Sequence, residues 1–385
     1  MGITTAFRDS IALRESYETY LAFLQAENFD YIVLKSASLS WEHDKRLIHT
    51  IAQRLPRTRF IITGPITRAR RDGAGRSPQH SGRGSGRIRK RRHQGSEWRQ
   101  WSRRFRSSDR RGNEQRALPL FRCHLCPPRY WDSNPVGQKA PQLQILTSRG
   151  CPYKCIFCVW PTTMTGHDPD GSRKRTVRQY NAEYLEALLT ELIGRYHFQS
   201  VYFDDDTFNL GDRHVEKVCA IMRKLDVPWS AMCRADTSSF HLWQEMKDSG
   251  CFGVKIGFES GNQDVVDKIV NKRLDLEEAR RVAFEVRRVG MTLHGTFTFG
   301  LPGETHEQMQ DTERYIASLP LNSIQKSGCA EIEGAPLHSL NTEKSLKAYP
   351  DARIDANYVR ATDGQAKIER MLKEEKGIEG GVGGG

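Results

Sequence analysis

Short apolar runs alternate with helical patterns from Gln142 onward, and this alternation limits the possible folds more than any other feature. The apolar runs predict strands at Leu143–Leu146, Val201–Phe203, Trp229–Cys233, Val254–Phe258 and Met291–Phe299. Apolar residues at helical spacing predict helices at 181–193, 212–225, 242–249, 274–289 and 307–319. Strands and helices in alternation predict a parallel sheet with right-handed crossovers. We therefore expect an α/β fold with an open or closed barrel, whose site lies at the carboxyl ends of the strands.

Three cysteines follow the first of these strands in a C-x3-C-x2-C pattern, as Cys151, Cys155 and Cys158. Thiolates are soft ligands that suit iron–sulfur clusters or zinc. Three sulfurs on one tight loop can bind one object and leave a fourth coordination position open. An open position is typical of catalytic metal centres, because a substrate can occupy it.

Two other interpretations of the cysteines stay open at this point. Cys123 and Cys126 form a C-x2-C pair, which would complete a four-thiolate zinc site with Cys155 and Cys158. Disulfides are the second alternative, although nine cysteines in a chain without a secretory signal should stay reduced. The remaining four suit ordinary buried thiols: Cys219, Cys233, Cys251 and Cys329.

The positive charge is concentrated in residues 68–116. This segment holds 17 Lys and Arg against 4 Asp and Glu, whereas the whole 385-residue chain has a formal charge of +12. With so few apolar residues the segment cannot offset its ordering entropy, so we expect disorder. Three interpretations of residues 68–116 stay open. The segment is a nucleic-acid-binding arm with Trp98 and Trp101 for stacking, a solvated linker, or a sequence translated in a shifted reading frame that interrupts a domain.

The N-terminal part also has an α/β pattern. It predicts helices at 17–24 and 44–55 and strands at 31–34 and 59–63. This is a βαβ unit, about half of a doubly wound sheet. A fragment with so few strands is not expected to be stable alone.

The segment Arg149–Cys158 resembles the signature of radical S-adenosylmethionine (SAM) enzymes, and the resemblance extends over residues 145–320. It implies that Cys151, Cys155 and Cys158 bind a 4Fe-4S cluster, whose fourth iron is chelated by SAM. It also implies reductive cleavage of SAM to a 5′-deoxyadenosyl radical, which requires an electron donor.

The same resemblance assigns further cofactor contacts, and leaves the catalytic residues undefined. Phe157 is similar to the aromatic residue beside the adenine. Asp204 and Asp205, with Asp206, end the second strand, where acidic groups lie near SAM; the alternative is a helix-capping loop. Arg234 and Asp236 would hold the SAM carboxylate, or form a surface ion pair. The glycine-rich strand end implies contacts from Gly257, Glu259 and Ser260, and Gly300, predicted to close the sixth strand, either has the same role or starts a plain turn.

A Rossmann-like half before such a barrel resembles the cobalamin-binding subgroup, and so does the text Cys158-Val159-Trp160-Pro161. This implies cobalamin as a further cofactor, although the Asp-x-His-x-x-Gly signature of that subgroup is absent. The resemblance implies four domains: a partial Rossmann-like unit of cobalamin-binding type at 1–66, an Arg-rich segment and linker at 67–141, a partial TIM-like (β/α)6 radical SAM barrel at 142–340, and an extension with a flexible Gly-rich tail at 341–385.

We therefore predict a radical SAM enzyme that methylates or rearranges an unactivated carbon of a small-molecule or lipid-like substrate. No apolar run is long enough to span a membrane, so the predicted location is the cytoplasm. The alternatives are a zinc-stabilised basic nucleic-acid-binding protein and a radical SAM tRNA-modifying enzyme, in which residues 68–116 contact the nucleic acid. If residues 68–116 are shifted-frame text, the chain is a damaged or truncated copy with its core site intact.

Overall fold

The fold was obtained as a computed structural model, which describes residues 6–8, 10, 13–35, 41–63, 122–124, 140–159, 177–332, 335–340 and 359–360. The predicted Arg-rich segment, Cys126, Trp160, Pro161 and the Gly-rich tail lie outside these residues. The division of the chain into four domains stays a prediction.

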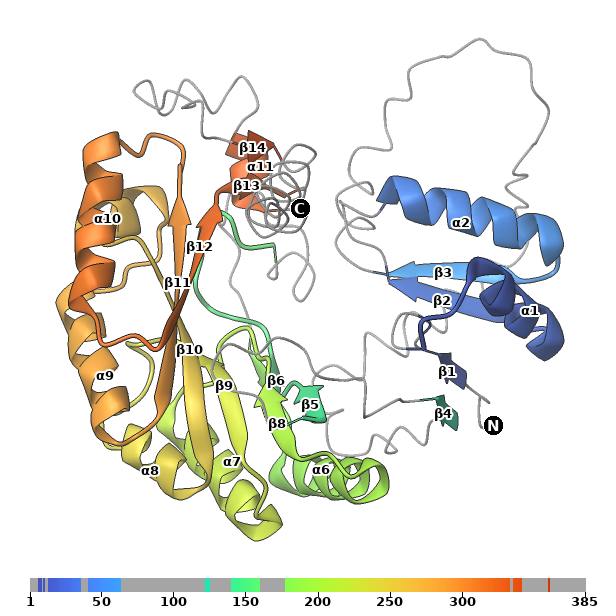
Figure 1. The fold of residues 1–385 in the computed structure, drawn as a ribbon, viewed down its shortest axis with the longest axis horizontal. Helices are drawn as coiled ribbons and strands as arrows, with labels where there is room; N and C mark the ends of the chain where they lie inside the picture. The colour runs from blue at the N-terminus through green and yellow to red at the C-terminus, as the bar shows by residue number, and fades with distance from the viewer. Residues whose placement is uncertain are drawn as a thin grey trace, which may run out of the picture.

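A six-stranded parallel sheet forms the main body of the molecule, as predicted (Figure 1). Its strands are β5 (Gln142–Ile145), β8 (Ser200–Phe203), β9 (Trp229–Cys233), β10 (Cys251–Glu259), β11 (Thr292–Phe299) and β12 (Ser323–Gly328). The spatial order β12-β11-β10-β9-β8-β5 follows the chain without reversal. Each crossover therefore adds one strand in the same direction, as in an open barrel, and the strands end at a common edge.

Five helices connect the strands and lie on the outer side of the sheet (Figure 1). They are α6 (Ala182–Tyr196), α7 (Asp212–Leu225), α8 (Leu242–Asp248), α9 (Leu276–Arg288) and α10 (His306–Ser318). Alternate strand residues face them. On β10, for example, Val254, Ile256 and Phe258 are fully buried in the core between sheet and helices. Lys255, which lies between Val254 and Ile256, points to the opposite face of the sheet.

The helix ends follow the chemistry read from the sequence. Asn181 is the N-cap of α6, where its side chain accepts a hydrogen bond from the Tyr184 N–H. Gly250 and Gly290 have φ of 94° and 82° after α8 and α9, so the predicted glycine stops are confirmed.

The last strand of the sheet differs from the prediction. Gly300 follows β11, which is the fifth strand of the sheet, and the sixth is β12. The sequence Ser-Ile-Gln-Lys-Ser-Gly of β12 has no apolar pattern because it forms an edge strand that is half-exposed or exposed along its length. A short π-helix, η3 (Val265–Ile269), was also not predicted.

The N-terminal part contains the predicted βαβ unit. Helices α1 (Tyr17–Glu27) and α2 (Trp41–Arg54) accompany the parallel strands β2 (Tyr31–Lys35) and β3 (Arg59–Thr63). The core of this unit is small and consists of Leu21, Leu24, Ile32, Ile51 and Leu55. A second parallel pair joins β1 (Ala6–Arg8) to β4 (Arg122–His124), which lie on either side of the Arg-rich segment in the sequence.

Five further short elements complete the described structure. Strands β6 (Ser148–Arg149) and β7 (Arg178–Gln179) form an antiparallel pair beside the cysteine loop. Strands β13 (Ala330–Glu331) and β14 (Val359–Arg360) pair in parallel, and α11 (Pro336–Leu340) lies between them in the sequence. Within the described part of the chain, no helix is both long and apolar enough to span a membrane.

Candidate functional site

The residues predicted to carry chemistry gather at the carboxyl edge of the sheet. The cysteine loop follows β6, and the three aspartates from Asp204 follow β8. Arg234 directly follows β9, Glu259 ends β10 and Gly300 follows β11. Since all six strands are parallel, these positions share one edge, where α/β proteins place their sites.

The first cysteine is held by the end of β8. Cys151 Sγ lies 3.5 Å from Thr207 Oγ1, and the N–H of the preceding Gly150 donates to Asp206 Oδ2 at 2.8 Å. Gly150 has φ of 99°, a left-handed conformation that other residues rarely adopt, so it turns the chain into the loop.

Asp205 is buried and binds the segment just before the loop. Its carboxylate accepts hydrogen bonds from the N–H and hydroxyl of Thr147 and from the N–H and hydroxyl of Ser148, at 2.5–3.2 Å. Thr147 Oγ1 also lies 2.8 Å from His214 Nε2. Burial raises the pKa of Asp205 to about 6, against the lowering effect of these hydrogen bonds. Burial lowers the pKa of His214 to about 3.

The helix-capping interpretation of the acidic strand end is wrong. The N-cap of α7 is Gly211, and Asp205 and Asp206 bind the residues before the cysteine loop instead. Asp204 accepts a hydrogen bond from the Gln144 side chain at 2.6 Å, which ties it to β5.

The second and third cysteines are held by a different part of the molecule. Ile156 N–H donates to the Val270 carbonyl at 2.9 Å, and the Ile156 carbonyl accepts from Leu337 N–H at 2.8 Å. Cys158 N–H donates to the Cys155 carbonyl, which closes a tight turn. Cys155, Ile156 and Phe157 pack against an apolar cluster of Val265, Val270, Leu301, Cys329 and Leu337. This packing places Phe157 in an apolar setting.

The donor set suits an iron–sulfur cluster. All three cysteines are reduced and half-buried, whereas the four cysteines predicted to be ordinary core thiols are buried, as expected. Burial raises the pKa of the Cys155 thiol, while the positive charges of Lys272 and Arg234 lower it. The pKa stays raised overall, so the two cations offset only part of the effect of burial.

A site for a single ion does not form here. Within the described residues, no three His, Cys, Asp or Glu side chains come close enough to hold one metal ion. Sulfurs around one zinc lie about 2.3 Å from the metal, whereas the cysteines of a four-iron cluster bind separate irons across a wider object. Cys126 of the alternative zinc set lies outside the described residues.

Arg234 is buried and joins β9 to the cysteine loop. Its guanidinium binds both carboxylate oxygens of Asp236, at 2.5 and 2.9 Å, and donates to the Lys272 carbonyl at 2.6 Å. Its Cζ lies 3.6 Å from the ring centroid of Tyr153, inside the loop. Only 5% of the Arg234 side chain is exposed, whereas Asp236 is an exposed residue, so the surface description fits the carboxylate and not the guanidinium.

Glu259 and Lys272 form a second buried ion pair at the same edge. Their Oε1 and Nζ atoms are 2.8 Å apart, and Thr298 donates to the other carboxylate oxygen. A Cβ at Gly257 would lie 2.4 Å from Glu259 Oε1, so the absence of a side chain makes room for this pair. Glu259 itself has φ of 71°, where β10 departs from regular pairing with β11.

The last two predicted contacts, Ser260 and Gly300, lie in turns. Ser260 is fully buried and its hydroxyl lies 2.9 Å from Thr312 Oγ1 of α10. Gly300 has φ of 69° and begins a turn in which Glu304 N–H donates to the Leu301 carbonyl. The plain-turn interpretation of Gly300 thus describes its backbone.

Sequence reasoning missed Tyr153, Thr207 and Lys272. Tyr153 lies within the cysteine motif, and Thr207 directly follows the three aspartates. Their positions next to predicted site residues could have identified both. Lys272 lies in a loop between η3 and α9, where no pattern marks it.

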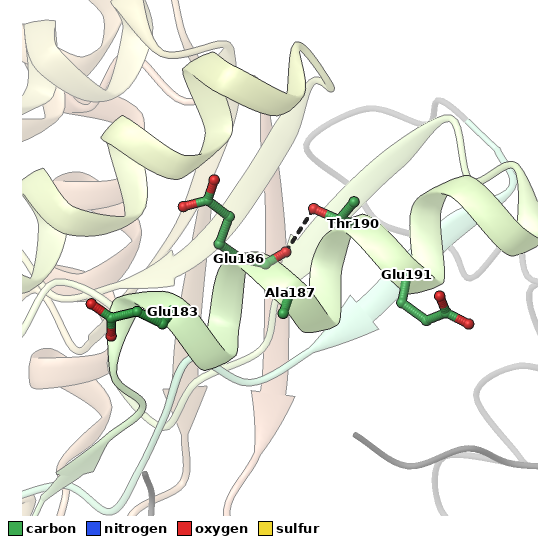
Figure 2. A pocket seen from close by; sticks show the side chains of 5 residues that line it. All are labelled: Glu183, Glu186, Ala187, Thr190 and Glu191. Carbon is green, nitrogen blue, oxygen red and sulfur yellow. Dashed lines mark hydrogen bonds between the residues drawn. The ribbon is translucent and has the colours of Figure 1, made fainter. Parts of the chain in front are cut away.

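A shallow pocket elsewhere is separate from this edge. Figure 2 shows it along one face of α6, lined by Glu183, Glu186, Ala187, Thr190 and Glu191. The drawn hydrogen bond is internal to the helix and joins the Thr190 hydroxyl to the Glu186 carbonyl. Since a single helix lines it and no strand end reaches it, it is not part of the site.

Comparison with known proteins agrees with this geometry. Residues 145–316 match the Radical SAM superfamily. Cytidylyl-2-hydroxyethylphosphonate methyltransferase of Streptomyces wedmorensis is 30% identical over 213 residues, covering 52% of this chain and 37% of that protein. The cobalamin-dependent radical SAM methyltransferase TokK of Streptomyces tokunonensis is 23% identical over 212 residues, covering 53% and 29%.

The same fold is found in TsrM from Kitasatospora setae, a radical SAM methyltransferase. Its structure with tryptophan substrate and a SAM analog has a TM-score of 0.62 at 15% identity, covering 86% of this chain and 68% of that chain. Its structure with cobalamin and a [4Fe-4S] cluster has a TM-score of 0.59. The chain spans less than half the length of the curated relatives it matches.

Proposed function

We propose that the chain is a radical SAM enzyme of the cobalamin-dependent subgroup, which cleaves one SAM reductively and transfers the methyl group of a second SAM to a carbon of its substrate. The observation that carries the proposal is the cysteine loop. Three half-buried thiols lie on a loop fixed at both ends, at the carboxyl edge of the sheet.

In this proposal Cys151, Cys155 and Cys158 hold a 4Fe-4S cluster, and a reducing partner provides the electron. The cluster, when bound, would supply the electron that cleaves SAM. The protein's own contribution includes two cations: the side chains of Lys272 and Arg234 offset part of the rise in the Cys155 pKa that burial causes. Both cations are held by carboxylates, which fixes their positions.

We assign the SAM contacts to the remaining residues of the edge. The candidates are Phe157 in the cysteine loop and five residues at or beside strand ends, namely Asp204, Gly257, Glu259, Ser260 and Gly300. Glu259 is the most constrained, because an ion pair and a left-handed backbone fix it. The N-terminal βαβ unit would contribute to a cobalamin site, since TsrM binds cobalamin and has a similar fold.

The substrate is proposed to be a polar small molecule rather than a lipid. The sheet face away from the helices has a row of side chains in register, Met232, Lys255, His294 and Ser323. Lys255 Nζ lies 4.4 Å from the Tyr202 ring centroid, and His294 Nδ1 lies 2.9 Å from Ser323 Oγ. The interior of an ordinary TIM barrel is packed with branched apolar residues, so this polar row favours a polar ligand. The relative that acts on a cytidylyl phosphonate suggests the same class.

Anaerobic reconstitution with iron and sulfide tests the proposal. The native chain should bind about four irons and, with dithionite and SAM, form 5′-deoxyadenosine or S-adenosylhomocysteine. Cys155→Ala should lose both the cluster absorbance and the product. Cys219→Ala is the matched control, because Cys219 is a buried core thiol on α7 and should leave iron binding unchanged. Iron-free native protein with one bound zinc would refute the proposal.

A further inference from the structure

Three successive residues at the end of β8 hold the chain that leads into the cysteine loop. Asp205 binds Thr147 and Ser148, Asp206 binds the N–H of Gly150, and Thr207 lies against the sulfur of Cys151. Residues 147–151 and residues 205–207 therefore lie side by side. The later a residue comes in 205–207, the closer its contact lies to Cys151 in the sequence. We call residues 205–207 the β8 clamp.

Asp205 makes the strongest contacts of the β8 clamp. Both backbone and both side-chain donors of Thr147 and Ser148 point at its carboxylate, and the residue is only 2% exposed. Hydrogen bonds to a carboxylate are stronger than neutral ones. The Asp205 carboxylate therefore binds four donors of the protein itself. This differs from the contact with SAM that was predicted for it from the sequence.

The other half of the loop does not depend on β8. Ile156, between the second and third cysteines, is hydrogen-bonded to Val270 after η3 and to Leu337 of α11. The side chain of Asn271 adds a contact to the Lys154 carbonyl at 3.4 Å. Loss of the β8 clamp would thus release the first cysteine while the other two stay anchored.

We propose that Asp205 is a positioning residue that fixes Cys151 relative to Cys155 and Cys158, and that it does not bind SAM. The inference rests on the proposed function, because it concerns ligands of the same cluster. It differs from an ordinary structural role, since removal of the carboxylate should change the cluster before SAM is added.

Asp205→Asn tests this, because it keeps the side-chain shape but removes the charge and replaces one acceptor oxygen with a donor. After anaerobic reconstitution we expect iron affinity about 10- to 100-fold lower, as for other groups that orient metal ligands. The electron paramagnetic resonance spectrum of the reduced cluster should also change in the absence of SAM. The dissociation constant for SAM should stay within about twofold in the chains that retain a cluster, because in this proposal Asp205 does not contact SAM.

Two further variants keep the result interpretable. Asp212→Asn is the matched control, because Asp212 also accepts from the N–H and hydroxyl of one serine, Ser239, but at the start of α7. It should leave iron affinity and the spectrum unchanged. Thr147→Val removes one hydroxyl donor of the same network and should change the spectrum in the same direction as Asp205→Asn, by less.

The outcomes separate this inference from the proposed function. A native chain that binds no cluster refutes the proposed function, whatever Asp205 does. A native chain with a cluster, together with an Asp205→Asn protein whose iron affinity and SAM-free spectrum match it, overturns the inference. An Asp205→Asn protein that keeps a normal cluster and binds SAM at least tenfold more weakly would instead make Asp205 a SAM ligand. If Asp205→Asn does not fold, the Thr147→Val spectrum decides.

Discussion

The two parallel-strand units of this chain bury their strands to very different extents. In the barrel, all four residues of β8 are buried, on both faces of the sheet. In the N-terminal unit, β2 buries Ile32 against the helices, while Tyr31 and Val33 are 50% and 65% exposed on the other face. A parallel sheet is normally covered on both faces. The N-terminal sheet is therefore covered by helices on one face alone in the described structure, whereas strand β8 of the barrel is buried on both faces.

This difference explains where the chemistry lies. In the part of the chain that the structure describes, the cysteine loop contacts residues in and after the π-helix η3 and residues of α11. Contacts on several sides fix the positions of its three sulfurs. The N-terminal unit offers two strand ends and a core of five buried residues. We expect the barrel to fold and bind the cluster whether or not the N-terminal unit is ordered.

Matched leucine truncations in the two cores test this expectation and should give the largest effects. Leu189→Ala in α6 removes a fully buried barrel side chain and should lower the free energy of unfolding by about 2–5 kcal/mol, with loss of iron binding as the barrel unfolds. Leu24→Ala in α1 should remove hydrogen-exchange protection from residues 17–63 alone. Both are measured by hydrogen exchange and iron content, and loss of the cluster in Leu24→Ala would show that the two units are interdependent.

A glycine pair sharpens the comparison within the barrel and should have a smaller effect. A Cβ at Gly261 would lie 2.3 Å from Tyr315 Cβ and 2.8 Å from Thr312 Cα, atoms that cannot move without α10. Gly261→Ala should therefore destabilise the barrel by about 1–3 kcal/mol, measured by chemical denaturation.

Gly194→Ala is the control for that measurement. No atom lies within 4 Å of a Cβ at Gly194, which is an exposed position of α6. Alanine there should stabilise the helix by about 0.5–1 kcal/mol. Equal changes in the free energy of unfolding at the two positions would mean that the close contact between Gly261 and α10 does not exclude a side chain.

The barrel could be read from the sequence because its strands and helices have separate, strong patterns. Asp212–Leu225 and Trp229–Cys233 were predicted with their observed bounds, and the cysteine loop with its position after the first strand. The edge strand β12 could not be predicted from the sequence, because an exposed edge strand does not need alternating apolar and polar residues. Likewise, the pairing of β1 with β4 joins residues that are far apart in the sequence, and neither short segment has a pattern.

Individual roles at the site were harder to predict than positions. The acidic residues after β8 were placed at the correct edge, but the sequence does not tell which carboxylate turns inward. Asp205 binds the segment before the loop and Asp204 binds Gln144, although both follow the same strand. Lys272 comes to Glu259 from a loop 13 residues later, and this contact depends on the packing of η3.

The effect that is smallest at neutral pH, and grows as the pH falls, is expected from His214, which contacts Thr147 just before the cysteine loop. Burial, and then the positive charge of Lys217, lower the pKa of His214 to about 3, against about 6.5 for an ordinary histidine. Between these values the unfolded chain binds a proton at this residue and the folded chain does not, so its contribution to stability falls as pH decreases from 6.5 toward 3. His214→Gln should flatten this part of the pH dependence of the thermal midpoint, while His306→Gln, at an exposed position of α10, should leave it unchanged. Parallel pH profiles for the native chain and His214→Gln would show that the buried imidazole is not held neutral, and the contact between Thr147 and His214 would then have to be reassigned.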